Sequence, residues 1–474
     1  MRSAFTVTSL SLVLLATSCS NDDAPANPSD AGNQQSGGTA GMPTGSGGSS
    51  AKAGSAGQSG GTGGTAGAAA GGRGNAGTAP APEAGLLDAG PPDAGPPDAS
   101  APADGGDAST VVEPCAVDDG QCIFRHDTFG DEQLWTDVLR LNELVQTLPP
   151  TTALAVGLKV DSDAVPSSVL ASADLSDPAT TVALLGLDAV VGVRAQVDDG
   201  VVKEIGITCA ICHSTVDDSV TPGIGKRLDG HPNRTLDPGG ILALTPGIGD
   251  FAASLGVSKT DAVNALESWG PGRYDARFNQ DKQSHPVLIP PAYGLRNVAL
   301  ETYTGEGPVT YWNNYVAVTQ MGAHGDFTDP RLGLAIVQSP DRVTPKLPAL
   351  RDYQFSLDPP APPSGSFDSA AAARGKTLFE GAAKCSTCHA GASFTDAPTL
   401  HAAAETGMEP IEAMRSTTGK YRTTPLRGAW SHPPYFHDGS AKTFADVVDH
   451  YDGALNLSLT DAQKADLVEY LKSL

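Results

Sequence analysis

Large apolar side chains are distributed very unevenly along this chain. Residues 21–110 consist mostly of Gly, Ala, Ser, Pro, Thr and Asp, with hardly any large apolar side chain. A segment of this composition buries too little surface to offset its conformational entropy. We therefore predict a disordered linker over residues 19–110 and expect the fold to begin near Val111.

Periodic apolar positions then predict helices and one hairpin. Leu134, Val138 and Val145 share one side of an expected helix that runs from Asp131, its N-cap, to about Thr147. Further helices are expected at 258–268 and 344–357. A β-hairpin is predicted from 190–197 and 201–207, joined by Asp198-Asp199-Gly200. The stretch 285–348 is rich in Pro, Gly and aromatic residues and is typical of long ordered loops with short helices.

A second folded segment follows a proline-rich linker that starts at Asp358. We expect a helix over Ser369 to Phe379 and a last helix over 461–474, capped by Thr460. Leu467, Val468, Leu471 and Leu474 recur at helical spacing in that last helix.

The chain begins with features of a bacterial export signal. Residues 1–18 combine Arg2 with a short apolar run, which is too short to span a membrane as a helix. The sequence before Cys19 resembles a lipoprotein cleavage box, so we expect Cys19 to be lipidated. A plain signal peptide cleaved further along is the alternative.

Net charge and the remaining cysteines agree with export. The formal charge of −24 argues against nucleic acid as a partner. Cys115 and Cys122 are spaced to close a small disulfide loop, which is permissible outside the cytoplasm. Free thiols at these two positions are the alternative.

Two copies of one motif carry the chemistry of the chain. Cys209-Ala-Ile-Cys212-His213 and Cys385-Ser-Thr-Cys388-His389 match Cys-x-x-Cys-His, the pattern of c-type haem attachment. The two thiols of each motif bond to the haem and the histidine binds its iron. A zinc or disulfide site is the alternative for a single motif. Two motifs in one exported chain favour two covalently bound haem c groups.

The second half of the chain then suggests a family. Residues 422–440, RTTPLRGAWSHPPYFHDGS, resemble the bacterial di-haem cytochrome c peroxidases and MauG. This resemblance implies a mainly α protein with two cytochrome c-like domains, long ordered loops and a small β-hairpin. The N-terminal haem domain, 111–357, would hold the reactive haem, and the C-terminal domain, 367–474, would transfer electrons.

The resemblance also suggests the sixth ligand of the C-terminal haem. The axial residue of the family falls on Tyr451, as in MauG, and its neighbour His450 competes for the role. Met408 or Met414 on the intervening loop is a further alternative. The family gives the residue at His437 a structural or propionate-binding role.

The N-terminal haem departs from the peroxidase pattern. Those enzymes have Ile-Gly-His after the motif, whereas this chain has Ile224-Gly225-Lys226. His231 could substitute as a cap, or could lie at the surface or beside a propionate. We expect an open or weakly capped iron that binds peroxide or dioxygen.

Residues 305–327 resemble the di-haem rubber oxygenases instead. In that family a Trp and a Phe line an apolar dioxygen pocket, and Trp312 and Phe327 match them in type and spacing. The two aromatic side chains could equally pack in the core. The folded part is shorter than a rubber oxygenase, which argues against cleavage of polyisoprene.

Carboxylates and tryptophans complete the candidate site. Glu301 or Glu306 could move the proton that peroxide chemistry needs, or could be a solvated loop charge. Trp312, Trp269 or Trp430 could relay electrons between the haems. The peroxidases also hold Ca²⁺ between their domains, which suggests Asn233 and the backbone of 423–424 as ligands.

Three functions are compatible with these features. The first is a peroxidase-type oxidoreductase that uses hydrogen peroxide and receives electrons from a small donor protein. The second is a dioxygenase that acts on an apolar substrate, and the third is an electron carrier without catalysis. In each case we expect a periplasmic or cell-surface lipoprotein of a Gram-negative-type bacterium, held by its lipid at the inner or outer membrane.

Overall fold

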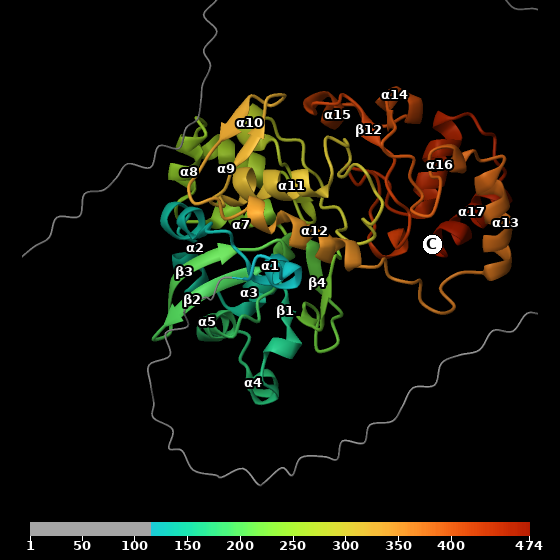
Figure 1. Cartoon of the computed structure of the whole chain (residues 1–474). Helices are drawn as coiled ribbons and strands as arrows, with labels where there is room; N and C mark the ends of the chain where they lie inside the picture. Colours follow the sequence, from blue (N-terminus) through green and yellow to red (C-terminus); the bar gives the residue numbers. More distant parts are fainter. Residues whose placement is uncertain (1–114) are drawn as a thin grey trace, which may run out of the picture. The chain divides into compact units, whose positions relative to one another are not determined.

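The β-hairpin before the first haem motif forms as predicted. In a computed structural model of the chain, which describes residues 115–474, strand β2 (Val193–Asp198) pairs antiparallel with β3 (Val201–Ile207). Asp199 and Gly200 both have positive φ, at 50° and 72°, as a tight hairpin turn requires. The hairpin, green in Figure 1, leads directly to Cys209. The predicted signal peptide, Cys19 and the whole predicted linker lie outside the described residues.

The described part of the chain is mainly helical with small sheets. Before the proline-rich linker, the helices are α1 (Gly120–His126), a π-helix (Gln133–Val138), α2 (Leu141–Val145), α3 (Pro150–Ala155), a 3-10 turn (Ser162–Ala164), α4 (Ser167–Ser172), α5 (Pro178–Gly186), α6 (Ala210–His213), α7 (Pro238–Leu244), α8 (Ile248–Ser254), α9 (Lys259–Glu267), α10 (Phe278–Asp281), α11 (Val309–Val316), a second π-helix (Ala317–Met321), a 3-10 turn (Thr344–Lys346) and α12 (Leu347–Ser356).

Every sheet in the described residues has two strands. Besides β2 and β3, the pairs are β1 (Val160–Asp161) with β5 (Ile224–Gly225), β4 (Ser214–Val216) with β6 (Arg227–Asp229), β7 (Arg273–Tyr274) with β8 (Val287–Leu288), β9 (Phe327–Asp329) with β10 (Leu334–Ile336), and β11 (Leu400–His401) with β12 (Tyr421–Arg422).

The predicted helix from Asp131 to Thr147 is wrong. A π-helix ends at Val138, and Arg140 adopts a left-handed conformation with φ of 59° before α2 begins. The Leu139 carbonyl accepts a hydrogen bond from the amide of Gly247 in place of a helical partner. Asp131 does not cap this helix, because its carboxylate accepts the amide of Ile207 in β3. Tertiary contacts therefore interrupt the helical pattern.

The C-terminal segment packs its first and last helices together. Helix α13 (Ser369–Glu380) crosses α17 (Asp461–Lys472), as Figure 1 shows in orange and red. A Cβ atom at Gly375 would lie 2.0 Å from the carbonyl oxygen of Asp466, so the crossing requires glycine. Thr460 caps α17 by accepting the amide of Gln463, as predicted. The other elements here are a 3-10 turn (Cys385–Thr387), α14 (Ala403–Thr406), α15 (Ile411–Arg415), a 3-10 turn (Ala429–Ser431) and α16 (Phe444–Ala454).

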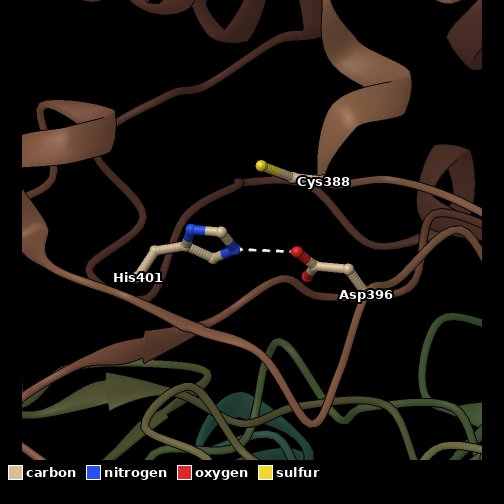
Figure 2. Close-up of side chains that lie close together, drawn as sticks. All are labelled: Cys388, Asp396 and His401. Carbon is tan, nitrogen blue, oxygen red and sulfur yellow. Dashed lines mark hydrogen bonds and ion pairs between the residues drawn. The ribbon is translucent and has the colours of Figure 1, made fainter.

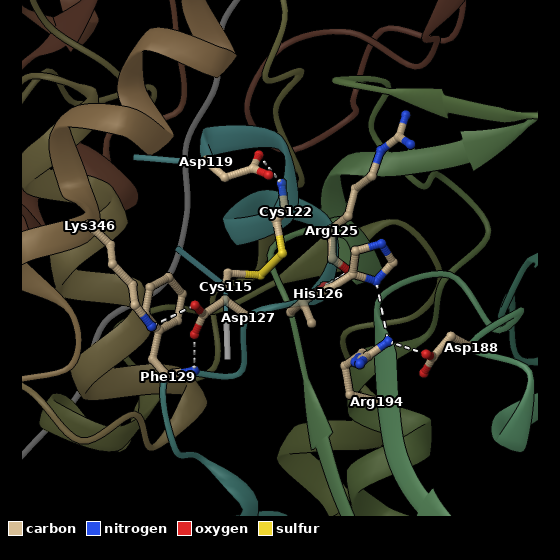
Figure 3. The surroundings of a disulfide bond; sticks show 11 residues. Cys115, Asp119, Cys122, Arg125, His126, Asp127, Phe129, Asp188, Arg194 and Lys346 are labelled. Carbon is tan, nitrogen blue, oxygen red and sulfur yellow. Dashed lines mark hydrogen bonds and ion pairs between the residues drawn. A yellow bond between two sulfur atoms is a disulfide. The ribbon is translucent and has the colours of Figure 1, made fainter. Parts of the chain in front are cut away.

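Cys115 and Cys122 form a disulfide at the start of the described chain (Figure 3). The bond joins the chain before α1 to the first turn of that helix, where Asp119 accepts the amide of Cys122 at 2.9 Å. Close by, the ammonium of Lys346 pairs with the carboxylate of Asp127 at 2.5 Å and ties α1 to the segment before α12. A disulfide and an ion pair thus stabilise the N-terminal edge of the described fold.

The remaining predicted elements need little adjustment. Helix α9 matches the expected 258–268, and α12 with the 3-10 turn before it matches 344–357. The proline-rich linker joins α12 to α13 without regular structure. In the described part of the chain, no helix has both the length and the apolar content to cross a membrane.

Candidate haem-binding sites

The first Cys-x-x-Cys-His motif lines a buried cavity of 320 Å³, here named the first cavity. Its residues turn through α6 and contribute Cys209, Cys212 and His213 to the lining. The Nδ1 atom of His213 donates to the carbonyl of Pro290 at 3.0 Å. Burial lowers the pKa of His213 to about 4, so its imidazole is neutral. A neutral ring with Nδ1 fixed in this way directs Nε2 to bind a metal.

The second motif repeats this arrangement in a cavity of 580 Å³, the second cavity. Cys385, Cys388 and His389 line it, and His389 donates its Nδ1 hydrogen to the carbonyl of Phe394 at 3.1 Å. Burial also lowers the pKa of His389. Both histidines are therefore neutral, fixed by a backbone carbonyl and placed with two thiols that form no disulfide. These residues fit the covalent attachment of haem c.

The two alternatives for the sixth ligand at the second cavity point in different directions. Tyr451 lines the cavity, and burial raises its pKa to about 12. His450 does not line it, because its Nε2 bonds the carbonyl of Thr406 at 2.9 Å. Met408 lines the cavity, whereas Met414 is 68% exposed and lies outside it. Of the four candidates for the sixth ligand, Tyr451 and Met408 are thus the two that line the second cavity.

His437 also lines the second cavity, where it makes two polar contacts. Its Nε2 lies 3.2 Å from the hydroxyl of Tyr421 and 3.5 Å from a carboxylate oxygen of Glu409. Burial lowers the pKa of His437. With its ring nitrogen held by these two groups, His437 is suited to the structural role that the sequence suggested.

Of the two aromatic residues expected beside the reactive haem, only Trp312 lines the first cavity. Its indole Nε1 is buried without a hydrogen-bond partner in the described structure. Phe327 is buried against Tyr311 and Tyr315, with ring centroids 5.7 and 5.4 Å away, and is not on the lining of the cavity. Sequence spacing does not tell which side of the aromatic cluster a ring takes, so the role suggested for Phe327 stays a prediction.

The two candidate proton carriers, Glu301 and Glu306, occupy different positions relative to the cavities. Glu306 lies outside both cavities, in a buried ion pair with Arg277 of 2.6 Å, and accepts the amide of Thr417. These contacts give its carboxylate a structural role, and the catalytic role suggested for it stays a prediction. Glu301 lines both cavities, and burial raises its pKa to about 7.

Several residues that the sequence did not single out also line the cavities. His285, Arg277 and Glu412 face the first cavity, and among the described histidines only His213 and His285 do so. Glu412 comes from the C-terminal segment, 135 residues after Arg277, to which it pairs at 3.2 Å. Neither motif nor periodicity signals such a contact, because it arises from packing between segments distant in sequence.

His401 is a further unpredicted residue of the second cavity (Figure 2). Its Nε2 bonds Asp396 at 2.9 Å, and ligand atoms of Cys388, Asp396 and His401 lie within 4.8 Å of one another. This is a set of metal-ligand types, but Cys388 is the second thiol of the haem motif. The same sulfur cannot serve a haem thioether and a separate ion, so the pair of Asp396 and His401 belongs to the haem cavity.

The other predicted residues lie around the cavities. His231 packs against the ring of Tyr293 and is not on the lining of the first cavity. The amide oxygen of Asn233 accepts the amides of Thr235 and Leu236, and the Thr423 carbonyl accepts the hydroxyl of Thr395. These oxygens, suggested for Ca²⁺, are used within the chain. Trp269 and Trp430 line neither cavity.

A family comparison identifies the fold around the second motif. The family model for cytochrome c matches residues 372–474. This segment is a cytochrome c domain. The domain implies covalently bound haem c, for which Cys385, Cys388 and His389 are the matching residues.

Comparison with other proteins adds little beyond this domain. Hydrazine synthase from Kuenenia stuttgartiensis is similar over 40% of this chain and 72% of its own, with 20% identity and a TM-score of 0.29. A MauG-like protein associated with microbial copper homeostasis is similar over 31% of this chain and 55% of its own, with 22% identity and a TM-score of 0.22. No curated protein matches the chain. Likeness of this degree carries no argument about activity.

Proposed function

We propose that the protein is an exported di-haem c-type oxidoreductase of the peroxidase kind. The observation that carries this proposal is the pair of Cys-x-x-Cys-His motifs in two cavities with a common wall. The first cavity would hold the reactive haem and the second the electron-transfer haem. Tyr451 lines the second cavity, whereas His231, which could have substituted as a cap of the first iron, is not on the lining of the first. This inequality supports one site for chemistry and one for electrons.

Each residue of the cavities has a separate role in this proposal. Bound haem supplies the redox chemistry at each site. His213 presents a neutral Nε2, and the Pro290 carbonyl on its other nitrogen increases its basicity as a ligand. Glu301 lies in the wall of the first cavity with a pKa raised to about 7, so its carboxyl can exchange a proton there near neutral pH. Glu412 on the same lining has a similarly raised pKa, but it is held by the cations of Arg277 and Arg415. Trp312 and the surrounding apolar side chains exclude water from the site.

Addition of peroxide to the half-reduced holoprotein tests the proposal. We expect the optical spectrum of one haem to change stoichiometrically while the other haem is oxidised. EPR of the oxidised protein should show one haem that binds added cyanide and one that does not. Low-spin, six-coordinate signals from both haems, with no response to peroxide in any redox state, would identify an electron carrier and overturn the proposal.

A dioxygenase acting on an apolar substrate is the second candidate. The specific observation in its favour is the apolar lining of the first cavity away from the motif, by Leu144, Leu148, Val156, Leu185, Leu244 and Phe251. A stable dioxygen adduct in the reduced protein would favour this activity, whereas rapid autoxidation in air would count against it. The same preparation answers both questions.

Export and an electron-donor partner are parts of the proposal. The disulfide between Cys115 and Cys122 supports an oxidising compartment, since such bonds are rare in the cytosol. A chain with a formal charge of −24 attracts a small donor protein with a basic face and repels nucleic acid. Metabolic labelling with a fatty acid in the native host, with Cys19→Ala as the control, tests the lipid anchor.

A further inference from the structure

The two haem cavities share a wall formed by one segment of the chain. Pro290, Pro291, Leu295, Glu301 and Tyr303 line both cavities. The same segment contacts the first motif, since the carbonyl of Pro290 accepts from His213. Any group in this wall therefore faces the surroundings of both haem sites at once.

Backbone hydrogen bonds hold the central part of the wall in place. The amide of Glu301 bonds the carbonyl of Gly307 at 2.8 Å, and the carbonyl of Tyr303 accepts the amide of Arg422 at 2.8 Å. Near these bonds Gly305 has φ of +60°, and a Cβ atom there would lie 2.7 Å from Cδ2 of Leu400. The segment therefore packs closely against the cytochrome c domain at a position whose backbone conformation favours glycine.

Glu301 is a buried ionisable group of this wall whose carboxylate has few polar partners. Its side chain is 9% exposed, and its Oε2 lies 3.3 Å from Nη1 of Arg422. Three polar atoms at this point are buried without a hydrogen-bond partner in the described structure: Oε1 of Glu301, Oγ1 of Thr302 and Nη1 of Arg422. Unpaired buried polar atoms are costly and call for an explanation in function or in an unseen water or ligand group.

The backbone beside Glu301 is strained. Thr302 is β-branched yet has φ of 59°, a conformation that such residues rarely adopt. The Nε of Arg422 donates to the carbonyl of Thr302 at 2.7 Å and holds it there. Strain that the surroundings maintain in this way is concentrated at functional positions.

The charges that face Glu301 leave its protonation state sensitive to any new charge. Arg422 is the cation in contact, and Tyr303, itself beside Arg234, is the other titratable side chain of the wall. On the lining of the first cavity, Arg277 is paired with Glu412, and His285 lies further along. On the lining of the second cavity lie Glu405, His401, which bonds Asp396 behind it, and His437 beside Tyr421.

Burial and Arg422 act on Glu301 in opposite directions. Burial raises the pKa of the Glu301 carboxyl to about 7, against the lowering effect of the Arg422 cation. A carboxyl that is half-protonated near neutral pH responds to an added electron nearby by binding a proton, because the negative charge disfavours the carboxylate. The geometry of the wall puts this carboxyl beside both sites.

We propose that Glu301 couples electron arrival at the haem pair to the uptake of one proton. The inference rests on the proposed two-haem function. When a one-electron donor, such as a small redox protein, reduces ferric iron to ferrous, the Glu301 carboxylate takes one proton from solvent and becomes the neutral acid. When the electron leaves, the carboxyl returns the proton. One electron and one proton enter together, so the net charge of the wall and its neighbouring haem is unchanged.

Redox titration of the holoprotein at a series of pH values tests the coupling. With chemical mediators as electron donors, the midpoint potential of at least one haem should fall as the pH rises. The slope should approach 59 mV per pH unit, the value for one proton per electron. In Glu301→Gln, which cannot ionise, that slope should disappear around neutral pH. The matched control is Glu380→Gln, a carboxylate on α13 that is 58% exposed, which should keep the slope of the parent protein.

Two outcomes would overturn the coupling. One is a Glu301→Gln protein with the parent slope. The other is a parent protein whose potentials are independent of pH between 5 and 9. If Glu301→Gln does not fold, infrared difference spectra of the parent protein decide the question: reduction should produce a carboxylic acid band that shifts in D₂O, and its absence counts against the proposal.

Failure of the underlying function looks different from failure of the coupling. A chain that carries a single haem, or a di-haem chain inert toward both peroxide and dioxygen, would defeat the proposed function. Covalent haem is counted independently by the pyridine haemochrome assay on the same sample. A protein with two haems and peroxide reactivity, but without the pH-dependent potential, would defeat only the role of Glu301.

Discussion

Arg277 lies over the indole ring of Trp312, with its Cζ atom 6.0 Å from the ring centroid. The same guanidinium pairs with Glu306 at 2.6 Å and with Glu412 at 3.2 Å. Three segments far apart in sequence therefore meet at one buried cation: the chain before α10, the loop before α11 and helix α15 of the cytochrome c domain. This contact fixes the tryptophan of the first cavity by charge as well as by packing.

Removal of that cation should destabilise the fold strongly. In Arg277→Gln the buried carboxylate of Glu306 loses its cation and Glu412 keeps only Arg415, and breaking a buried ion pair costs about 3–5 kcal/mol. We expect the free energy of unfolding, measured by urea denaturation of the holoprotein, to fall by this amount.

The control for Arg277 is Arg351→Gln. Arg351 is 41% exposed and pairs with Asp352, which is 65% exposed, so the pair is screened by solvent. Its removal should leave the unfolding midpoint within error of the parent protein. Equal losses of unfolding free energy in the two variants would show that the buried ion pairs of Arg277 stabilise the fold no more than an exposed pair does.

Haem content should follow the two motifs one by one. A Cys209→Ala, Cys212→Ala double variant should lose one of two covalently bound haems, and a Cys385→Ala, Cys388→Ala variant should lose the other. Mass spectrometry of the intact chain and the pyridine haemochrome assay both measure this count. A protein that loses no haem when Cys209 and Cys212 are replaced would refute the first site.

The two neighbours on α16 should behave differently. Tyr451 lines the second cavity, so Tyr451→Phe should change the EPR spectrum of the haem in the cytochrome c domain. His450 bonds Thr406 and packs away from that cavity, so His450→Ala should leave the spectrum as it was. If both variants keep the parent spectrum, Met408→Leu becomes the informative substitution, because Met408 is the other ligand type on the lining.

The buried carboxyl in the shared wall should make folding stability depend on pH. The pKa of Glu301 is raised from 4.5 to about 7 in the folded chain, so the protonated form is the one that folding favours. Its contribution is fully present below pH 4.5 and is lost as the pH rises through 7. Relative to Glu301→Gln, the parent protein should lose on the order of 3 kcal/mol across this range. Urea denaturation of both proteins at pH 4, 6 and 8 measures the difference.

Local signals predicted much of the secondary structure. The Asp-Gly turn of the β2–β3 hairpin and the Thr460 cap of α17 act within a few residues, so the sequence displays them directly. The haem motifs are equally local. Where a distant partner intervenes, the pattern misleads: the amide of Gly247 takes the carbonyl of Leu139, and the expected helix breaks.

The site was harder to predict than the helices for the same reason. The sequence does not distinguish Trp312 from Phe327, whereas in the fold Trp312 lines the first cavity and Phe327 packs against Tyr311 and Tyr315. Glu412 reaches that cavity from the cytochrome c domain, which no motif indicates. Contacts between distant segments decide such positions, and spacing along the chain does not encode them.

In the proposed di-haem protein, the carbonyl of Pro290 would link the chemistry of the two redox sites. It accepts the hydrogen bond of His213 and would increase the electron-donating strength of that imidazole, while Pro290 also lines the second cavity. A substitution that repacks the second cavity at Pro290 would therefore also shift the reduction potential of the first haem. Variants at this wall would then change both potentials, and with them the driving force between the haems.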